Sequence, residues 1–197
     1  MYHTPIRLPR LLMPREGLDL SKWAVVACDQ YTSQPDYWAK ADAYVGDAPS
    51  TLRLTLPEVY LEQPDVQERT AEIQKTMLRY QQDGTLTEYA PGMILVERTT
   101  QSGTRRGVVL AFDLEAYDYN PGSQSLIRPT EKTVVERIPP RLAVREGASL
   151  ELPHIMLLID DPDRKVIEPL FARKDSFRQA YDTDLMLGGG HLSGWFV

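Results

Sequence analysis

A cluster of basic side chains stands out in a chain whose formal net charge is −6. The cluster consists of Arg128, Lys132, Arg137, Arg141 and Arg145. A guanidinium group binds a carboxylate or phosphate through two parallel N–H donors, so several arginines that meet at one point form an anion pocket. We therefore predict that Arg128, Arg137 and Arg141 bind a phosphorylated or carboxylated small metabolite.

Two residues inside this cluster would complete the pocket. Thr130 would present its hydroxyl and its backbone amide at the first turn of a helix, where the helix dipole favours negative charge. Glu131 would orient an arginine or act as a base. The alternative is that Glu131, Glu136 and Glu146 pair with the arginines on a solvated face, and such surface pairs contribute little.

A second group of polar residues directly follows the apolar run 23–28: Asp29, Gln30 and Tyr31. If that run is a strand, the group lies at its carboxyl end, where ligands gather in α/β sheets. We therefore predict that these residues line the same cleft as the arginines. The alternative is that the segment caps a helix through Thr32 or Ser33. Cys28 is expected to pack as a small hydrophobic residue rather than act as a nucleophile.

Three carboxylates follow another apolar run, 154–159, and are of the type that holds a hard cation such as magnesium: Asp160, Asp161 and Asp163. The sequence Asp-Asp-Pro-Asp is also ordinary turn chemistry, and a turn is the interpretation we favour. His154 and His191 stand at no recognised zinc spacing. No metal site is predicted, and the glycine triplet 188–190, which lacks the lysine of a phosphate loop, is expected to be a flexible crossover.

The apolar pattern predicts the elements that would position these groups. Strands are expected at 23–28, 51–56, 93–99, 107–114 and 154–159, with 101–106 as the loop of one antiparallel hairpin. Helices are expected from Pro35 to Gly46, at 65–82, in two pieces split by the Pro139-Pro140 pair, and within 166–181. Residues 1–22, with three prolines, are expected to form an irregular arm.

This alternation of elements predicts the fold class. It is α/β, with a mixed sheet, helices packed against it and a single domain over residues 1–197. The chain is apolar up to Val197, which predicts a strand that continues beyond it and hence the N-terminal part of a longer protein. A terminal strand docked in the sheet is the alternative.

Composition narrows the class of protein. Hydrophobic residues make up 42% and charged residues 25%, as in a globular rather than a disordered chain. No apolar run approaches the roughly 20 residues of a membrane span, and the first residues lack the apolar core of a signal peptide. The single cysteine cannot form a disulfide within the chain, as is usual in a reducing compartment. Together these features predict a cytoplasmic protein without a membrane partner. The negative charge disfavours nucleic acid, and whether the chain forms a homo-oligomer is left open.

Five segments carry a resemblance to a known family. They lie at 25–35, 46–53, 128–131, 136–141 and 152–162, the last reading Leu-Pro-His-Ile-Met-Leu-Leu-Ile-Asp-Asp-Pro. Together and in order they resemble the bacterial domain-of-unknown-function family 1015, over almost the whole chain. The resemblance implies a longer protein whose second half carries a Gly-Asp-Gly-Asn-His-Ser or Asp-Gly-His-His-Arg segment, similar to the catalytic turn of ParB-like free-serine kinases. Nothing in the present chain matches that segment.

The resemblance therefore implies phosphoryl transfer by the full-length protein. A nucleotide with magnesium is one cofactor that such a reaction would use, and no cofactor is assigned. We expect a protein that binds a small-molecule ligand and acts as a serine-kinase-like phosphotransferase when the downstream half is present. No catalytic residue is assigned. The alternative function is that of a non-catalytic protein-interaction or scaffold domain.

Overall fold

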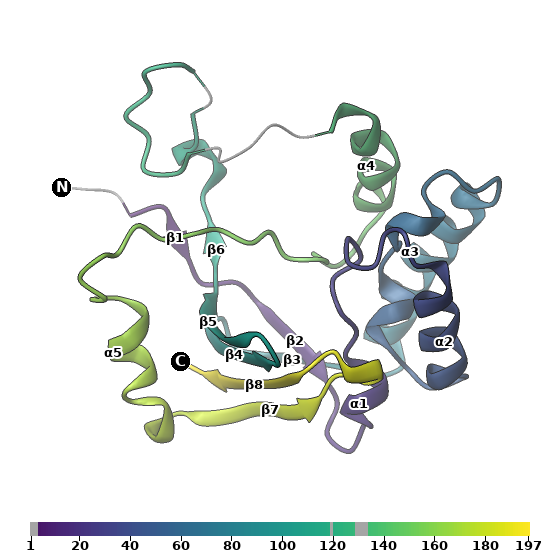
Figure 1. The fold of residues 1–197 in the computed structure, drawn as a ribbon, viewed down its shortest axis with the longest axis horizontal. Coiled ribbons are helices and arrows are strands. Elements are labelled where there is room, and N and C mark those ends of the chain that lie inside the picture. The colour runs from purple at the N-terminus through teal and green to yellow at the C-terminus, as the bar shows by residue number, and fades with distance from the viewer. Residues whose placement is uncertain (1–3, 119, 129–133) are drawn as a thin grey trace.

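Four antiparallel strands form the main sheet, in the order β5-β4-β8-β7 (Figure 1). Their bounds are Ile94–Thr100 for β4, Gly103–Val109 for β5, Arg178–Asp184 for β7 and His191–Phe196 for β8. The computed structural model describes residues 4–118, 120–128 and 134–197. Because β8 lies between β4 and β7, the centre of the sheet joins segments that are far apart in the sequence.

The hairpin of β4 and β5 forms where the sequence predicts it, with a shorter loop. Gly103 already pairs with Thr100, so only residues 101–102 connect the two strands. Gly103 adopts a φ of 137°, a conformation that residues with a side chain rarely take. Across the strands, Arg106 Nε donates to Glu97 Oε2 at 2.6 Å. This hairpin forms one edge of the main sheet.

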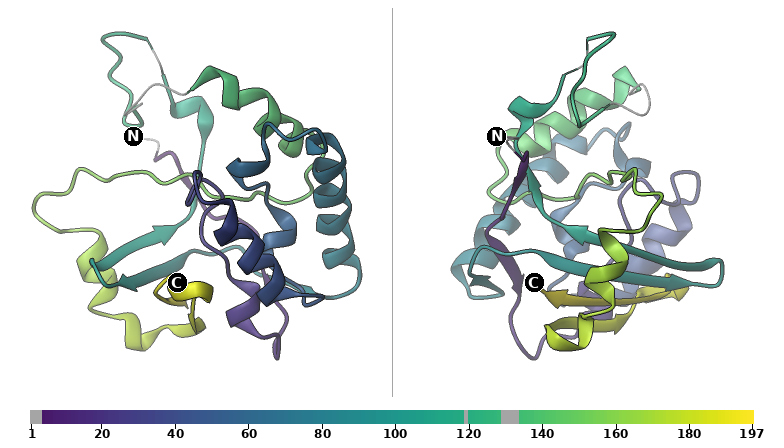
Figure 2. Two further views of the ribbon diagram at one scale, coloured as in Figure 1. Left: turned by 45° about the vertical axis from the view of Figure 1, so that its right-hand side comes forward. Right: turned by 90° about the vertical axis from the view of Figure 1, so that its left-hand side faces the viewer.

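Two predicted helices are confirmed and lie together on one side of the molecule, α2 at Pro35–Val45 and α3 at Val66–Gln82 (Figures 1 and 2). Pro35 opens α2 in its first turn and Gly46 ends it, as predicted. Each helix buries one face, at the spacing expected of an amphipathic helix. The buried residues are Trp38, Ala41 and Val45 in α2 and Ile73, Thr76, Met77 and Tyr80 in α3.

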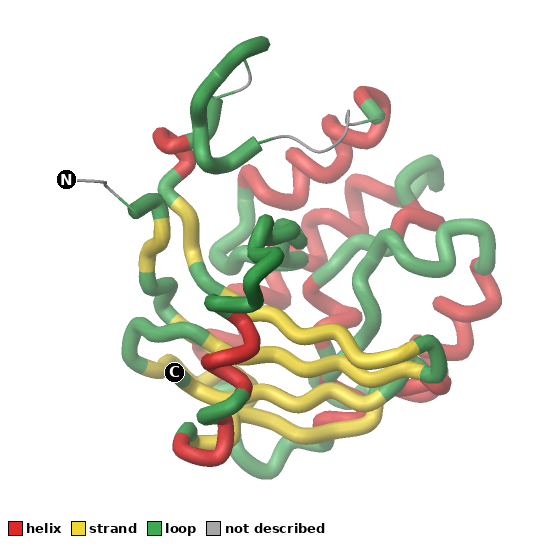
Figure 3. Tube along the Cα trace, turned by 60° about the vertical axis from the view of Figure 1, so that its left-hand side comes forward, coloured by secondary structure: helices red, strands yellow, loops and turns green. Residues whose placement is uncertain are grey.

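A short helix, α5 at Ile167–Phe171, crosses one face of the main sheet (Figure 3). Phe171 packs edge-on against Trp195 of β8, with 6.1 Å between the ring centroids. The helix predicted within 166–181 is therefore confirmed only in its first part, because the chain enters β7 at Arg178. β7 pairs with β8, which follows it through a glycine-rich turn. This pairing stabilises the extended conformation of 178–184 more than the local helical spacing stabilises a helix.

The remaining elements are short. Residues 4–22, predicted to be irregular, contain β1 (Ile6–Arg7), β2 (Leu11–Pro14) and the start of α1 (Leu20–Trp23). Antiparallel pairs join β1 to β6 (Ala111–Phe112) and β2 to β3 (Leu86–Tyr89). A further helix, α4, covers Ile138–Glu146. Short 3-10 helices are η1 (Thr51–Leu54), η2 (Glu58–Tyr60), η3 (Leu114–Ala116), η4 (Val135–Arg137), η5 (Lys174–Ser176) and η6 (Met186–Gly188).

Two predicted strands, 23–28 and 51–56, are wrong. The first leaves α1 and runs without strand pairing into a turn, and the second contains η1. The hydroxyls of Ser50 and Thr51 both donate to the carbonyl oxygen of Trp23, at 3.2 and 2.8 Å. These side-chain hydrogen bonds join the two segments and take the place of a strand ladder. The leucines of η1 are nevertheless buried, as the alternating pattern predicted.

The predicted strand 154–159 is also wrong, since this segment is an unpaired coil with its apolar side chains exposed. The predicted α/β class with one hairpin is confirmed, although the named strand pairs are antiparallel where a mixed sheet was expected. The parallel pairing recorded is an isolated bridge between Tyr117 and Ile127. Within the described ranges, none of the helices has the length and apolar character that crossing a membrane requires.

One histidine of the main sheet lies between two carboxylates of the neighbouring strand. His191 Nδ1 is 2.8 Å from Asp184 Oδ1, and its Nε2 is 3.2 Å from Asp182 Oδ1. The hydrogen bond with Asp184 is the main reason why the pKa of His191 is raised above its ordinary value of 6.5, and both negative charges add to it. A neutral imidazole carries only one N–H, so both contacts are fully formed only when His191 is protonated.

We expect an NMR titration to give His191 a pKa above 6.5. Because the folded-state pKa is raised, the stabilisation is complete below the unfolded value and is lost as the pH rises through the folded value. Asp184→Asn should lower the pKa of His191, whereas Asp160→Asn, on an exposed loop, should leave it unchanged. A pKa at or below 6.5 in the parent protein would contradict this assignment.

Candidate anion-binding site

The glutamate at the start of η2 has its side chain almost completely removed from water. The side chain of Glu58 is 5% exposed, and the residue follows the buried Pro57. Its backbone N–H donates to the carbonyl oxygen of Cys28 at 3.0 Å. Glu58 is therefore tied to the turn that contains the predicted pocket residues.

Two arginines reach the carboxylate of Glu58, one from the last residue of η4 and one from α4. Arg137 Nη1 is 3.2 Å from Oε2, and Arg141 Nη2 donates to Oε1. The two arginines are four positions apart, a spacing that places them on the same face of a helix. Their side chains are 52% and 43% exposed, so part of each guanidinium faces solvent while the carboxylate between them does not.

The sequence predicts two helical pieces split by Pro139 and Pro140, whereas in the structure both prolines lie inside one helix, α4. Pro139 and Pro140 occupy its first turn, where a missing N–H breaks no hydrogen bond, and η4 leads directly into it. The helix therefore offers few backbone N–H groups to a ligand at this end. An anion here would be bound mainly by guanidinium donors.

The buried thiol of Cys28 lies within the field of this cluster. Burial is the main cause that raises its pKa, the nearby Arg141 lowers it, and the charges of Asp29 and Glu58 raise it. The hydrogen bond of Cys28 with Glu58, which also pairs with Arg141, places the start of the 28–31 turn in this cluster. The raised pKa keeps the thiol protonated at neutral pH, in line with the prediction that Cys28 packs rather than reacts.

The three predicted residues after Cys28 are exposed and have different surroundings. Asp29 and Gln30 lie in a turn that is closed by a hydrogen bond from the Gln30 N–H to the carbonyl oxygen of Ala27, at 2.9 Å. Tyr31 has a φ of 53° and stacks on Tyr37, with 3.9 Å between the ring centroids. Tyr31 is thus part of an aromatic pair at the start of α2, and Asp29 and Gln30 remain open to solvent.

The other predicted residues do not join this site. Arg128 donates through Nε to the carbonyl oxygen of Ser125 at 3.1 Å, in a loop that lies apart from α4 in Figure 1. Arg145 pairs with Glu151. Thr130 and Glu131 lie outside the described residues, as does Lys132. The structure therefore brings together two of the predicted arginines and not the whole cluster.

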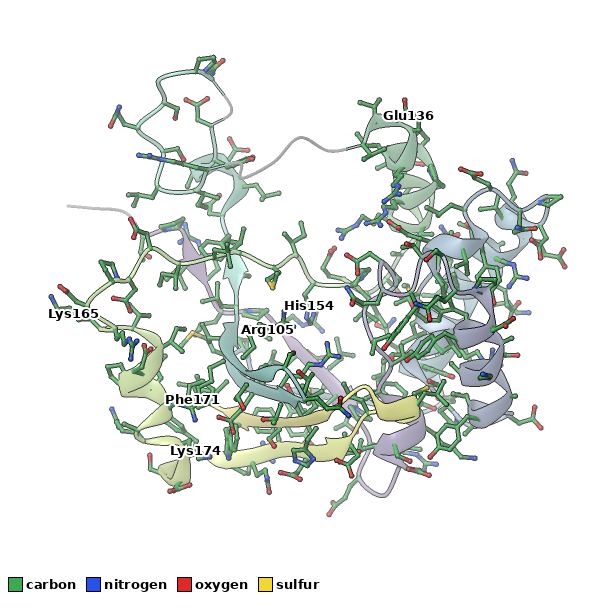
Figure 4. All side chains as sticks on the ribbon, in the orientation of Figure 1. Arg105, Glu136, His154, Lys165, Phe171 and Lys174 are labelled. Atoms are coloured by element: carbon green, nitrogen blue, oxygen red, sulfur yellow. The ribbon has the colours of Figure 1, made fainter. Side chains whose placement is uncertain are left out.

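The predicted alternative, in which glutamates near the arginines pair with them in open water, does not describe Arg137 and Arg141. Glu136 is exposed and points outward at the end of α4 in Figure 4. The partner of both arginines is instead Glu58, far away in the sequence. The signal for it was a polar residue directly after the buried run 54–57, and the argument applied to residues 29–31 would have singled it out.

The three aspartates after residue 159 form a turn, as predicted. Asp161 accepts hydrogen bonds from the backbone N–H groups of Lys165 and Val166, at 2.9 and 2.8 Å, and Asp163 pairs with the side chain of Lys165. In the part of the chain that the structure describes, no group of three or more histidine, cysteine or acidic side chains could hold a metal ion.

The fold and this site define an α/β protein in which a buried glutamate positions two half-exposed arginines. The family model described as "Protein of unknown function (DUF1015)" matches residues 12–197, so the chain belongs to the DUF1015 family. This confirms the resemblance carried by the five sequence segments. No curated protein and no solved structure matches the chain.

We expect Glu58→Ala to lower the free energy of unfolding by about 1–2 kcal/mol, because its two charged hydrogen-bond partners are half-exposed and regain water. Glu62→Ala, at an exposed position four residues later, should change it by less than about 0.5 kcal/mol. Urea unfolding followed by circular dichroism measures both. Equal values for the two variants would mean that the cluster does not hold α4 in place.

Proposed function

We propose that this protein binds a small metabolite that carries a phosphate or carboxylate, through Arg137 and Arg141. The observation that supports this most is that both arginines contact one carboxylate whose side chain is 5% exposed, while they themselves remain about half-exposed. Glu58 therefore holds the two guanidiniums in place from their buried side and leaves their solvent-facing N–H groups for a ligand.

The charge of the cluster favours an anion. Two guanidiniums and one carboxylate leave a net positive charge of one, in a chain whose overall charge is −6. Each guanidinium has five N–H donors in a fixed plane, and a single carboxylate accepts only some of them. A phosphate or carboxylate would thus replace water at donors that are already oriented.

The neighbouring turn would recognise the rest of the ligand. The side chains of Asp29 and Gln30 are exposed, and the turn is fixed to the site by the hydrogen bond between Cys28 and Glu58. Asp29 would repel a phosphate but accept a hydrogen bond from a hydroxyl or amino group, and Gln30 can donate and accept. A metabolite that carries both an anionic and a hydroxyl or amino group, such as phosphoserine, has this chemistry.

Phosphoryl transfer is the reaction we propose for the full-length protein, with a nucleotide and magnesium as cofactors. This part of the proposal rests on the resemblance to free-serine kinases, and it assigns the transfer chemistry to residues beyond the present chain. Thr130 and Glu131 remain proposed ligand residues that follow Arg128 in the sequence. The competing function is that of a non-catalytic interaction domain, which the exposed apolar segment 155–159 favours.

Isothermal titration calorimetry tests the binding proposal, with phosphoserine, inorganic phosphate and ATP with Mg²⁺ as ligands. We expect Arg137→Ala and Arg141→Ala each to weaken binding by about tenfold to a hundredfold, because each loses a charged hydrogen bond to the ligand. Arg145→Ala is the matched control, since it lies on the same helix but pairs with the exposed Glu151, and it should bind as the parent protein does.

Glu58→Gln separates ligand binding from a purely structural role of the arginines. It keeps the shape of the side chain but removes the carboxylate charge that positions the two guanidiniums, so affinity for phosphoserine should fall by about fivefold. If the arginines only hold α4 in place, affinity stays the same in every variant. Absence of binding by all three ligands would overturn the proposal in favour of an interaction domain.

A further inference from the structure

Five consecutive apolar side chains lie exposed on the coil that connects α4 to α5. Ile155 and Leu158 are 77% and 80% exposed, and Met156, Leu157 and Ile159 are between 48% and 65% exposed. The coil passes across the molecule in front of β6 in Figure 1, and His154, which directly precedes the five apolar residues, is labelled in Figure 4. Proteins that act as monomers rarely expose such a continuous apolar surface, so it is expected to be covered.

The backbone of this segment is available for pairing. Among the residues described, no backbone hydrogen bond is found for 154–160, and the side-chain contact recorded there joins Arg105 Nη1 to Met156 Sδ at 3.3 Å. Both ends are held in place. Arg145 Nη2 donates to the carbonyl oxygen of Pro153 at 3.4 Å, and Asp161 binds two backbone N–H groups of the following turn.

The edge of the main sheet within the same chain does not provide the partner strand. β5 is the last strand on that side, and a surface cavity of about 310 Å³ lies between it and this coil. Thr104 and Arg106 of β5 line the cavity on one side, and Ile159 and Asp161 line it on the other. The coil therefore runs near β5 without adding to the sheet.

The sequence of the segment is complementary to itself. Read outward from Leu157, Met156 is opposite Leu158, Ile155 is opposite Ile159, and His154 is opposite Asp160. An antiparallel pair of identical strands around a twofold axis places residues in this way. The arrangement matches apolar residues with apolar residues at the centre and a histidine with a carboxylate at each end.

We propose that two copies of this chain pair through residues 154–160 as an antiparallel two-stranded ribbon, with the twofold axis at Leu157. The ribbon supplies the missing backbone hydrogen bonds and places each apolar side chain beside an apolar side chain of the second copy, with 155, 157 and 159 on one face and 156 and 158 on the other. His154 of each copy then lies beside the partner's Asp160 and donates a hydrogen bond to it. This inference is independent of the anion-binding proposal, which concerns a different part of the surface.

Single cysteine variants test the register of the ribbon. Residues opposite each other in an antiparallel pair have Cα atoms about 4.5–5.5 Å apart, within the range of a disulfide. Leu157→Cys places a thiol opposite its own copy and should form a disulfide-linked dimer on mild oxidation. Ile155→Cys is the matched control, because its own copy lies about 13 Å away along the ribbon. The native Cys28 is 6% exposed, so the parent protein should stay unlinked.

A mixture of Ile155→Cys and Ile159→Cys chains should cross-link, although neither variant does so alone, because the ribbon places these two residues opposite each other. Equal cross-linking of Leu157→Cys and Ile155→Cys would indicate random collision and would overturn the proposal. So would failure of Leu157→Cys to cross-link under conditions that oxidise free thiols.

Analytical ultracentrifugation gives a second measurement without cysteines. We expect the parent protein to form a dimer, and Leu157→Glu to weaken the dimer by about a hundredfold or more, because two like charges then face each other on the axis. Leu157 belongs to none of the three buried apolar clusters that the described residues form, and circular dichroism checks that the variant is folded. A parent protein that stays monomeric at all concentrations, or is covered by a different partner, would overturn the proposal.

Discussion

The carboxylate of Glu58 lies where water hardly reaches it, and a charge in such a place must be compensated by charged hydrogen-bond partners. Arg137 of η4 and Arg141 of α4 provide this compensation, and the backbone N–H of Glu58 holds the turn at Cys28. A single residue thus links three segments from different parts of the sequence. The position of the guanidiniums, and with it any ligand chemistry, depends on this contact.

Local regularity explains which elements could be predicted from the sequence. The helix at 65–82 and the helix opened by Pro35 follow from amphipathic spacing and end signals that lie within each segment. The hairpin of β4 and β5 has strand-forming residues on both sides of its loop. In these cases the partner that completes the element is close in the sequence, so the pattern alone is sufficient.

The predicted strands that are wrong share one physical cause. The runs 23–28, 51–56 and 154–159 are apolar enough for a strand, but a strand also requires a neighbour with free backbone groups. The first two are joined by the hydroxyls of Ser50 and Thr51, and the third has no backbone hydrogen-bond partner in the described part of the chain. Apolar composition correctly predicted that the leucines of η1 are buried, but it wrongly predicted burial for 154–159. Packing, and not composition alone, decides where such residues lie.

The candidate site was predicted in part. Clustering in the sequence singled out Arg137 and Arg141, and the structure brings both to one carboxylate. It could not exclude Arg128 from the site, although this residue lies in a different loop. It could not find Glu58 either, because Glu58 and Arg141 are separated by 83 positions in the sequence. Charges that are adjacent in the sequence need not share a partner, and their true partner is fixed by tertiary packing.

Arginine side-chain NMR gives the most direct test of the central claim, that a buried glutamate presents two guanidiniums to an anion. The Nε–H signals of Arg137, Arg141 and Arg145 are followed while phosphoserine is added to the protein. The account predicts that the signals of Arg137 and Arg141 shift together and saturate at one ligand concentration, while that of Arg145 stays in place. Shifts that are equal for all three arginines and never saturate, or no shift at all, would contradict it.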